Sequence, residues 1–349
     1  MKILVLNAGS SSLKCWYHDL VGDEFDGPVV HPLWQEHTDW SFPGNIETIL
    51  RAVPGGVDVV GHRVVHGGRF HRSTLLTTEV RAAIAEETSI APAHNQLVLS
   101  AITAVERVLG AQMKQVAVFD TSFHASLEPA AYVYPGPYKW LDEGIRRYGF
   151  HGISHTYAAR RAAQLLERDP SALRLVTCHL GNGASLAAVK AGKSIDTTMG
   201  FTPLEGLMMG SRSGSIDPGV LIHLIRLHGY TADQLDDILY RQSGLLGISG
   251  ISSDMREILR AVDQGSERAQ LAFDIYTHHL VRGIGSMMAV LGGADALVFT
   301  GGVGENCTPL REAAAERFAF LPNLRILVIH AEEEWEIARA CYTLISAAQ

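Results

Sequence analysis

The sequence lacks three features that define large classes of protein. Its four cysteines are widely separated, which excludes the usual zinc-binding spacings and indicates reduced, buried thiols in a cytoplasm. It contains no basic run, and its formal net charge of −8 argues against a nucleic-acid surface. Its apolar runs are broken before they reach the length of a membrane span, and Met1 and Lys2 lead directly into a strand-like run. We therefore expect neither a membrane segment nor a signal peptide.

Short apolar runs that end in small residues occur at three places. Residues 3–6 are followed by Asn7, a turn rich in serine and a second apolar segment that carries Lys14. Residues 175–186 repeat this design, and residues 296–306 lead into the sequence GGVGEN. Backbone N–H groups in such turns can approach an anion closely because no side chain intervenes. One such turn is most often only a turn. Three of them, in a chain of 349 residues, indicate a polyphosphate held between two related halves.

Three polar side chains outside these turns are candidates for chemistry, and each has a structural alternative. Arg63 follows a buried strand predicted over 57–60 and either pairs with a carboxylate or clamps an anionic substrate. Asp120 follows a strand predicted over 116–119, where open α/β sheets place their chemistry, although an Asp at this position also caps turns. His151 precedes a predicted helix and is either a structural or a catalytic histidine.

Periodicity and capping residues predict the other elements. Residues 196–219 hold too many glycines for a helix and too many apolar residues for disorder, so we expect an ordered loop that lines a cleft and presents Arg212. Asp254 and Arg256 stand at a helix start, in a position suited to a ribose or a phosphate. Three adjacent glutamates at 332–334 favour either a helix N-terminus or a magnesium contact. Helices are expected over 79–90, 95–109, 154–168, 231–241, 254–264 and 266–291, and a final strand over 325–329.

Eight motifs resemble those of the acetate and propionate kinase family and occur in the family's order. They are NAGSSSLK, GHRVVHGG, FDTSFH, RRYGFHGISH, HLGNGAS, DTTMGFTPLEGLMMGSRSG, GISGISSDMRE and FTGGVGEN. The resemblance implies an α/β, two-lobed actin-like ATPase fold, in which duplicated ribonuclease H-like domains with mixed sheets surround a nucleotide cleft. It implies a first lobe of residues 1–135 and 336–349 on the acyl side, and a second lobe of residues 136–335 that binds nucleotide. It also suggests a homodimer through the second lobe, for which the apolar helix over 266–291 is suitable.

The same resemblance implies reversible phosphoryl transfer from ATP to acetate, with Mg²⁺ or Mn²⁺ as the metal, and no membrane or nucleic-acid partner. The metal positions match Asn7 and Glu333, with Glu332 and Glu334 as alternatives to Glu333. The catalytic positions match Asp120, His151 and Arg212. The acyl-substrate positions match Arg63, Val65, Ala93, Phe150 and Pro203. The ATP positions match Lys14, His179, Leu180, Gly181, Asn182, Gly183, Asp254, Met255, Arg256, Gly302, Val303, Gly304, Glu305 and Asn306.

Acetate fits this set of residues because its carboxylate is already ionised at neutral pH and needs no general base. The difficulty is to bring an anion against a triphosphate, and arginines, a histidine and Mg²⁺ ease it by electrostatic stabilisation. Propionate or another short-chain fatty acid is the alternative substrate, because Ala93 stands where the family usually has leucine. The chain is also shorter than the family between Lys14 and Gly61 and between Asn306 and Glu333.

Two other classes of function compete with a kinase. A nucleotide switch of the actin or Hsp70 kind would use ATP to change conformation, but a switch needs no carboxylate pocket of the kind that Arg63, Phe150 and Arg212 suggest. A kinase inactivated by its two shortened regions would have no need of Asn7 and Asp120, both of which are present. An assay for acyl phosphate separates the kinase from the nucleotide switch.

Overall fold

The computed structural model describes residues 1–9, 12–21, 25, 27, 29–39, 45–89 and 92–347, except for the side chains of Ser12, Asp39, Asn45, Ser89 and residues 92–94. Contacts between residues divide the chain into two units. Unit 1 consists of Met1–Ala125, His151–Tyr157 and Glu332–Gln349. Unit 2 consists of Ser126–Phe150 and Ala158–Ala331. Among the helices described, none is long and apolar enough to cross a membrane.

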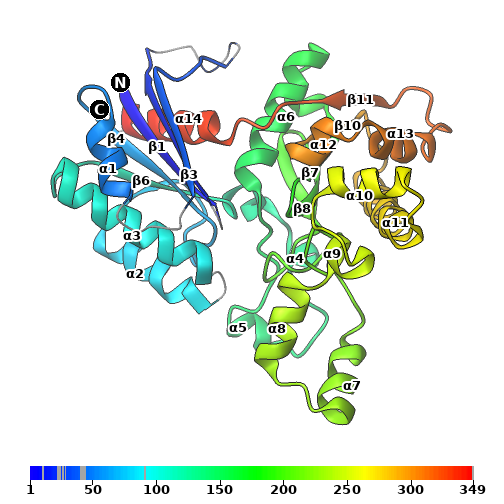
Figure 1. Cartoon of the computed structure of the whole chain (residues 1–349). Coiled ribbons are helices and arrows are strands. Elements are labelled where there is room, and N and C mark those ends of the chain that lie inside the picture. The colour runs from blue at the N-terminus through cyan, green and yellow to red at the C-terminus, as the bar shows by residue number, and fades with distance from the viewer. Residues whose placement is uncertain are drawn as a thin grey trace. The chain divides into compact units, whose positions relative to one another are not determined.

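Unit 1 is built on a six-stranded mixed sheet with the order β3-β2-β1-β4-β6-β5 (Figure 1). The first two strands form an antiparallel hairpin in which Asn7 lies opposite Lys14, while β4 and β6 run parallel to β1. Ser10 and Ser11, in the predicted phosphate turn of this hairpin, lie outside the described residues. The strands are β1 (Lys2–Ala8), β2 (Ser12–Asp19), β3 (Trp34–Asp39), β4 (Val59–Val64), β5 (Thr74–Leu75) and β6 (Gln115–Phe119).

Opposite faces of this sheet carry different helices, because successive side chains of a strand point to opposite faces. One face packs on α1 (Asn45–Ala52), α2 (Thr78–Glu86) and α3 (Pro92–Leu109) through an apolar cluster that includes Leu4, Val60 and Phe119. The other face packs on α14 (Glu333–Ser346). A Cβ atom at Gly61 would lie 2.5 Å from Sγ of Cys341, so glycine at this position lets α14 approach β4 closely.

Unit 2 repeats this strand order in a five-stranded sheet, which reads β9-β8-β7-β10-β11. β8 pairs antiparallel with both β7 and β9, whereas β10 and β11 continue the sheet in parallel with β7. Both units therefore join three antiparallel strands to two parallel ones, as expected for duplicated halves, and unit 1 adds a sixth strand, β5, antiparallel to β6. The strands are β7 (Arg174–Leu180), β8 (Ala184–Lys190), β9 (Lys193–Thr197), β10 (Ala296–Thr300) and β11 (Arg325–Val328).

The longest helix of unit 2, α11 (Glu267–Leu291), packs on β7, β8 and β9. Its Gly283 comes so close to the sheet that a Cβ atom there would lie 2.7 Å from Cδ1 of Leu186. Single turns of 3₁₀ helix occupy Glu87–Ser89, Ser122–Ser126 and Pro170–Ala172. The other helices are α4 (Pro129–Tyr132), α5 (Lys139–Asp142), α6 (Gly152–Leu166), α7 (Pro218–His228), α8 (Ala232–Arg241), α9 (Gly244–Ser249), α10 (Met255–Asp263), α12 (Gly301–Asn306) and α13 (Thr308–Glu316).

Several boundaries differ from the sequence-based expectation. The turn expected at GGVGEN folds as α12. Helix α6 runs from Gly152 to Leu166, so it begins and ends two residues before the range predicted for it, 154–168. Strand β4 continues past the predicted end at residue 60 to Val64 and includes Arg63. Helix α11 begins at Glu267, one residue after its predicted start, because Ser266 is its N-cap and accepts from the N–H of Ala269.

The chain also passes from one unit to the other at residues other than 135 and 335, the lobe boundaries that the resemblance implied. Oγ of Ser126 donates to the carbonyl of Ser194 in β9, 2.7 Å away, so the chain already belongs to unit 2 there. Glu333 and Glu334 both accept from Asn7 of β1, which joins them to unit 1. The chain therefore enters unit 1 for the last time at Glu332.

Candidate active site

Unit 1 gathers polar and charged side chains at the carboxyl ends of its parallel strands. Asn7 lies near the end of β1, Arg63 near the end of β4, and Asp120 directly after β6. Parallel strands bring their carboxyl ends to one edge of a sheet, where α/β proteins usually bind ligands. Lys14 of β2 and two residues of α14 complete this group, which we call the charged cluster: Asn7, Lys14, Arg63, Asp120, Glu333 and Glu334.

Arg63 lies at the centre of the charged cluster. Its Nε donates to both carboxylate oxygens of Asp120, at 3.2 and 3.1 Å, and its Nη2 donates to Oδ2 of Asp120 at 2.8 Å. Its Nη1 donates to Oδ1 of Asn7 at 3.2 Å and to Oε2 of Glu333 at 3.0 Å. Because a guanidinium has five N–H donors, these contacts leave one N–H of Nη2 for another acceptor.

Burial and ion pairing act in opposite directions on the pKa values of Asp120 and Arg63. Asp120 is 1% exposed, and burial raises the pKa of its carboxyl group to about 6, an effect that the Arg63 guanidinium opposes. Burial also lowers the pKa of Arg63, but the carboxylates of Asp120 and Glu333 raise it by more. Both groups are therefore ionised at neutral pH, and Arg63 is fixed in orientation by a two-point contact.

Asn7 and Lys14 connect the cluster to both glutamates of α14. Nδ2 of Asn7 donates to Oε2 of Glu333 at 3.1 Å and to Oε1 of Glu334 at 2.9 Å. Nζ of Lys14 lies 3.4 Å from Oε1 of Glu334, whose side chain is 3% exposed. Lys14 itself is half exposed, so it neutralises a buried glutamate while it presents its charge to solvent.

The oxygens expected to hold a metal suit Mg²⁺ in kind. Mg²⁺ prefers oxygen ligands and usually keeps several waters, with one or two carboxylates and substrate phosphates as the other ligands. Oδ1 of Asn7 and Oε2 of Glu333 both accept from Nη1 of Arg63, so they are close together. Within the described ranges, no group of three His, Cys, Asp or Glu side chains is disposed to hold an ion.

His151 is fixed beside Asp120 by its neighbour. The N–H of Gly152 donates to the carbonyl of Asp120 at 2.8 Å, and a Cβ atom at this position would lie 2.2 Å from that oxygen. His151 adopts a φ of 57°, an uncommon conformation for a residue with a side chain. Only glycine at 152 therefore permits the contact that joins the histidine loop to the end of β6.

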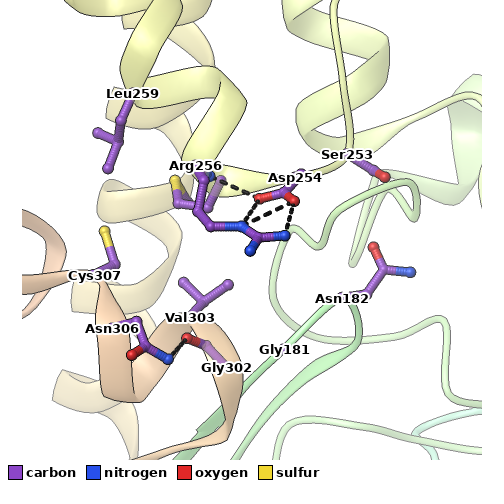
Figure 2. A pocket seen from close by; sticks show the side chains of 11 residues that line it. Gly181, Asn182, Ser253, Asp254, Arg256, Leu259, Gly302, Val303, Asn306 and Cys307 are labelled. Atoms are coloured by element: carbon purple, nitrogen blue, oxygen red, sulfur yellow. Dashed lines mark hydrogen bonds and ion pairs between the residues drawn. The ribbon is translucent and has the colours of Figure 1, made fainter.

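Unit 2 has a cavity of about 690 Å³ where unit 1 has the charged cluster (Figure 2). Most ligand pockets measure roughly 300–1,000 Å³, so this volume suits a nucleotide-sized molecule. Figure 2 shows the start of α10 on one wall, α12 on the opposite wall and the β7–β8 turn beside them. The lining residues are Gly181, Asn182, Ser253, Asp254, Met255, Arg256, Leu259, Gly302, Val303, Asn306 and Cys307.

Asp254 gives the α10 wall its shape. Its Oδ1 caps the helix by accepting from the N–H of Arg256 at 2.8 Å, and its Oδ2 lies 2.5 Å from Nη2 of the same arginine. Figure 2 shows this ion pair at the cavity, across from Val303. On the opposite wall, Nδ2 of Asn306 donates to the carbonyl of Gly302 at 2.8 Å. The cavity thus offers polar groups on two sides and apolar surface between them.

The cavity includes most, but not all, of the residues that the sequence assigned to ATP. His179, Leu180, Gly183, Gly304 and Glu305 do not line it, and Lys14 belongs to unit 1. Three lining residues were not predicted, namely Ser253, Leu259 and Cys307. Leu259 stands one helical turn after Met255, and the other two adjoin predicted residues, so extending each motif by one turn or one residue would have found them.

The residues assigned to the acyl group are divided between the units. Val65 belongs to unit 1, as does Ala93, whose side chain lies outside the described residues, whereas Phe150 and Pro203 belong to unit 2. Arg212 also belongs to unit 2, where its Nη1 donates to the carbonyl of Pro203 at 3.0 Å. Burial lowers the pKa of the Arg212 guanidinium. The structure thus joins Arg212 to Pro203, as it joins Arg63 to Asp120.

Comparison with known proteins decides the family. The model of the acetokinase family matches residues 47–326. The acetate kinase of Gloeobacter violaceus is 51% identical over an alignment of 400 positions, which covers 98% of this chain and 99% of that protein. The chain belongs to the acetokinase family. An alignment longer than the 349 residues of this chain agrees with the expectation that the chain is shorter than its family.

Solved structures of the acetokinase family have the same fold. The acetate kinase of Porphyromonas gingivalis superposes with a TM-score of 0.86 at 36% identity, over 99% of each chain. A propionate kinase from Francisella tularensis superposes with a TM-score of 0.86 at 32% identity, over 97% of this chain and 98% of that one. The expected actin-like ATPase fold with two mixed sheets is therefore confirmed, and so is the expectation that this acetokinase-family chain is a phosphotransferase.

Proposed function

We propose that the chain transfers the γ-phosphoryl group of ATP to acetate, reversibly and in line, to give ADP and acetyl phosphate. The observation that carries this proposal is the fixed guanidinium of Arg63, which has one N–H directed to no described partner and lies among carboxylates at the strand ends. An arginine held in this way suits a carboxylate substrate, and the relatives at about half identity are acetate kinases.

In this mechanism the chain positions two anions and stabilises the charge between them. Acetate is already ionised, so Asp120 orients Arg63 and removes no proton from the substrate. Arg212 and His151 would act on the transferring phosphoryl group, whose charge spreads over its equatorial oxygens in the transition state. Val65, Ala93, Phe150 and Pro203 would surround the methyl group of acetate.

The nucleotide would bind in the unit 2 cavity, with its adenosine between α10 and α12 and its phosphates near the glycine-rich turns. We assign Mg²⁺ to Asn7 and Glu333, because their oxygens lie together and are of the kind that Mg²⁺ prefers. When bound, the metal would neutralise the phosphate oxygens. The acceptor carboxylate would then be held by Arg63 of unit 1, and the nucleotide by the cavity of unit 2.

A second copy of the chain would cover α7 to form a homodimer. None of the eleven residues of α7 is buried in its own chain, and Val220, Ile222, Ile225 and Leu227 are between 45% and 72% exposed. A helix this short is marginal in water without packing. A second copy of the chain is present wherever the protein is made and can supply this packing, whereas an unrelated partner need not be present. Helix α11 corresponds to the apolar helix that the sequence suggested for this contact. It is less suitable than α7, because eight of its residues are already buried in unit 2.

Light scattering tests this assembly. Ile222→Asp combined with Ile225→Asp should convert a dimer into a monomer, because two charges would be buried in the interface. Leu271→Asp on α11 is the matched control, since Leu271 is 52% exposed and should tolerate the charge. Dissociation by Leu271→Asp, with no effect of the α7 pair, would assign the contact to α11 instead. We also infer a cytoplasmic location from the four cysteines, all free and buried.

Trapping of acyl phosphate as a hydroxamate tests the proposed reaction. Purified protein with MgATP should form acetyl hydroxamate when acetate and hydroxylamine are supplied. Propionate and butyrate, assayed in parallel, measure the alternative substrates. ATP hydrolysis without acyl phosphate from any acid would refute the proposal and favour a nucleotide switch.

A further inference from the structure

Glu305 belongs to the GGVGEN motif, but its side chain points to partners other than the lining of the cavity. Oε1 of Glu305 accepts from the N–H of Gly301 at 3.0 Å and from the N–H of Ala331 at 2.9 Å. Oε2 lies 2.5 Å from Nδ1 of His330. The carboxylate is 13% exposed, so three donors surround an almost buried charge.

These partners lie at two functionally different places. Gly301 begins α12, the helix whose Gly302, Val303 and Asn306 line the nucleotide cavity. Ala331 is the last residue of unit 2 before the chain enters unit 1 and the helix that carries Glu333 and Glu334. A single carboxylate oxygen therefore bridges the nucleotide wall and the segment that leads to the charged cluster.

Both ends of this bridge are fixed by other contacts. Nη1 of Arg311 donates to the carbonyls of Gly304 and Glu305, at 2.9 and 2.7 Å, which holds the carboxyl end of α12. The N–H of Ile329 donates to the carbonyl of Phe299 at 2.9 Å, which holds the segment before Ala331 against β10. The bridge thus joins two segments that other hydrogen bonds also hold in place, so a shorter side chain at 305 would lose one of its two N–H contacts.

We infer that Glu305 is a positioning residue that holds Ala331, and with it the entry to α14, against the first turn of α12, so that the first turn of α14 keeps Glu333 and Glu334 in the charged cluster. This inference rests on the proposed phosphoryl transfer. A displacement of about 1 Å far from the reacting atoms can lower a rate on the order of a hundredfold. In this inference, the length of the Glu305 side chain matters because it lets one oxygen reach the N–H groups of both Gly301 and Ala331. The negative charge of Glu305 contributes less to this positioning.

Two substitutions separate length from charge. Glu305→Gln keeps the length and an oxygen that accepts from both N–H groups, but it removes the charge. Glu305→Asp keeps the charge but is shorter by one methylene, about 1.5 Å, and cannot reach both N–H groups. His330→Ala is the matched control, because it removes the third contact and leaves the bridge to Ala331 in place; His330 is 75% exposed.

We expect Glu305→Asp to lower kcat roughly ten- to a hundredfold, with ADP affinity by calorimetry kept within about threefold. Glu305→Gln and His330→Ala should retain kcat within about threefold, an effect worth less than 1 kcal/mol. A Gln variant as slow as the Asp variant would overturn the inference, because the charge would then matter. An equal loss of kcat and ADP affinity in Glu305→Asp would also overturn it, since Glu305 would then only support the cavity.

Hydrogen exchange gives a readout that does not depend on the reaction. Glu305→Asp should speed amide exchange at Ala331 and in the first turn of α14, whereas Glu305→Gln should not. If the wild-type protein forms no acyl phosphate, the proposed function fails, and exchange still decides whether the bridge exists. Unchanged exchange in Glu305→Asp would overturn the inference whatever the activity of the enzyme.

Discussion

The two units share a strand order but fill the carboxyl ends of their strands in opposite ways. In unit 1, Asn7 lies opposite Lys14 one pair before the hairpin turn, whereas the corresponding pair in unit 2 is His179 and Ser185. Charged side chains then close the edge of the unit 1 sheet around Arg63. Glycines and a short helix leave a cavity of about 690 Å³ at the same edge in unit 2.

This difference shows how one scaffold serves two tasks in the proposed reaction. An acceptor carboxylate needs fixed positive charge, which a buried ion pair provides because its geometry cannot relax. A nucleotide needs room and backbone N–H groups, which glycine turns provide. If the division is correct, substitutions in the charged cluster should affect turnover, and substitutions in the lining of the unit 2 cavity should affect nucleotide affinity.

Asp120→Asn should have the largest effect, because it removes the partner that orients Arg63. We expect turnover to fall on the order of a thousandfold, similar to the loss of a strong transition-state contact. Breaking a buried ion pair should also lower the free energy of unfolding by about 3 kcal/mol. ADP affinity, measured by calorimetry, should remain unchanged because the cavity lies in unit 2. Loss of ADP binding by a folded variant would break the division between the units.

The sequence predicted the parts of this site that depend on local pattern. Buried runs predicted β1 and β6, and Asp120 was expected at the end of β6 for that reason. The cap of α10 was also visible, since Asp254 and Arg256 stand at a predicted helix start. These features depend on residues that are near one another in the chain. Apolar residues in strands and capping residues at helix starts recur in patterns only a few residues long, which can be recognised in the sequence.

Contacts between distant segments could not be predicted in the same way. The pairing of Asn7 with Glu334 joins residues 327 positions apart, and the three glutamates were equivalent in the sequence. Only the packing of α14 on β1 decides that Glu333 contacts Arg63 and Glu334 contacts Lys14. The helix α12 was hidden because glycine disfavours helices, whereas here the carboxylate of Glu305 accepts from its first N–H.

Arg63→Lys and Arg212→Lys should each lower kcat/KM by roughly a hundredfold, about 3 kcal/mol of transition-state stabilisation. Lysine keeps the charge but cannot reproduce a planar, two-point contact. Steady-state kinetics with acetate and ATP, together with a melting curve for each variant, give the measurement. Near-normal rates for both folded variants would contradict a requirement for the guanidinium shape.

Asp254→Ala should have a smaller effect and a different kind of effect, because it alters unit 2. Loss of a helix N-cap costs about 1 kcal/mol, so we expect ADP affinity to fall about fivefold as the cavity wall loosens. Asp254→Asn is the matched control, since asparagine caps helices about as well. With saturating ATP, kcat should not change. A large loss of kcat in Asp254→Ala would place reacting groups in this wall and remove the contrast with unit 1.

Ala93→Leu should have the smallest effect, confined to the choice of acyl group. Ala93 is the second residue of α3, whose first turn is tied to the chain next to Val65, because Nδ2 of Asn95 donates to the carbonyl of His66 at 3.1 Å. If Ala93 lines the proposed acyl site, alanine in place of leucine would admit an extra methylene, which is worth about 0.8 kcal/mol or roughly fourfold for propionate. One methylene discriminates poorly, so acetate should remain a substrate.

Restoring leucine should therefore lower the propionate-to-acetate ratio of kcat/KM by about fourfold, with little change in the value for acetate. The competing explanation is that Gln96 or Leu97, about one turn further along α3, already fills the gap. Gln96 is exposed on α3, which makes it the weaker candidate, while Leu97 is half-buried. The control is Gln96→Pro, which should leave the ratio unchanged if Ala93 sets the width. An unchanged ratio in Ala93→Leu would show that the acyl wall is formed by unit 2 residues such as Phe150, and the contrast between the units would then extend to specificity.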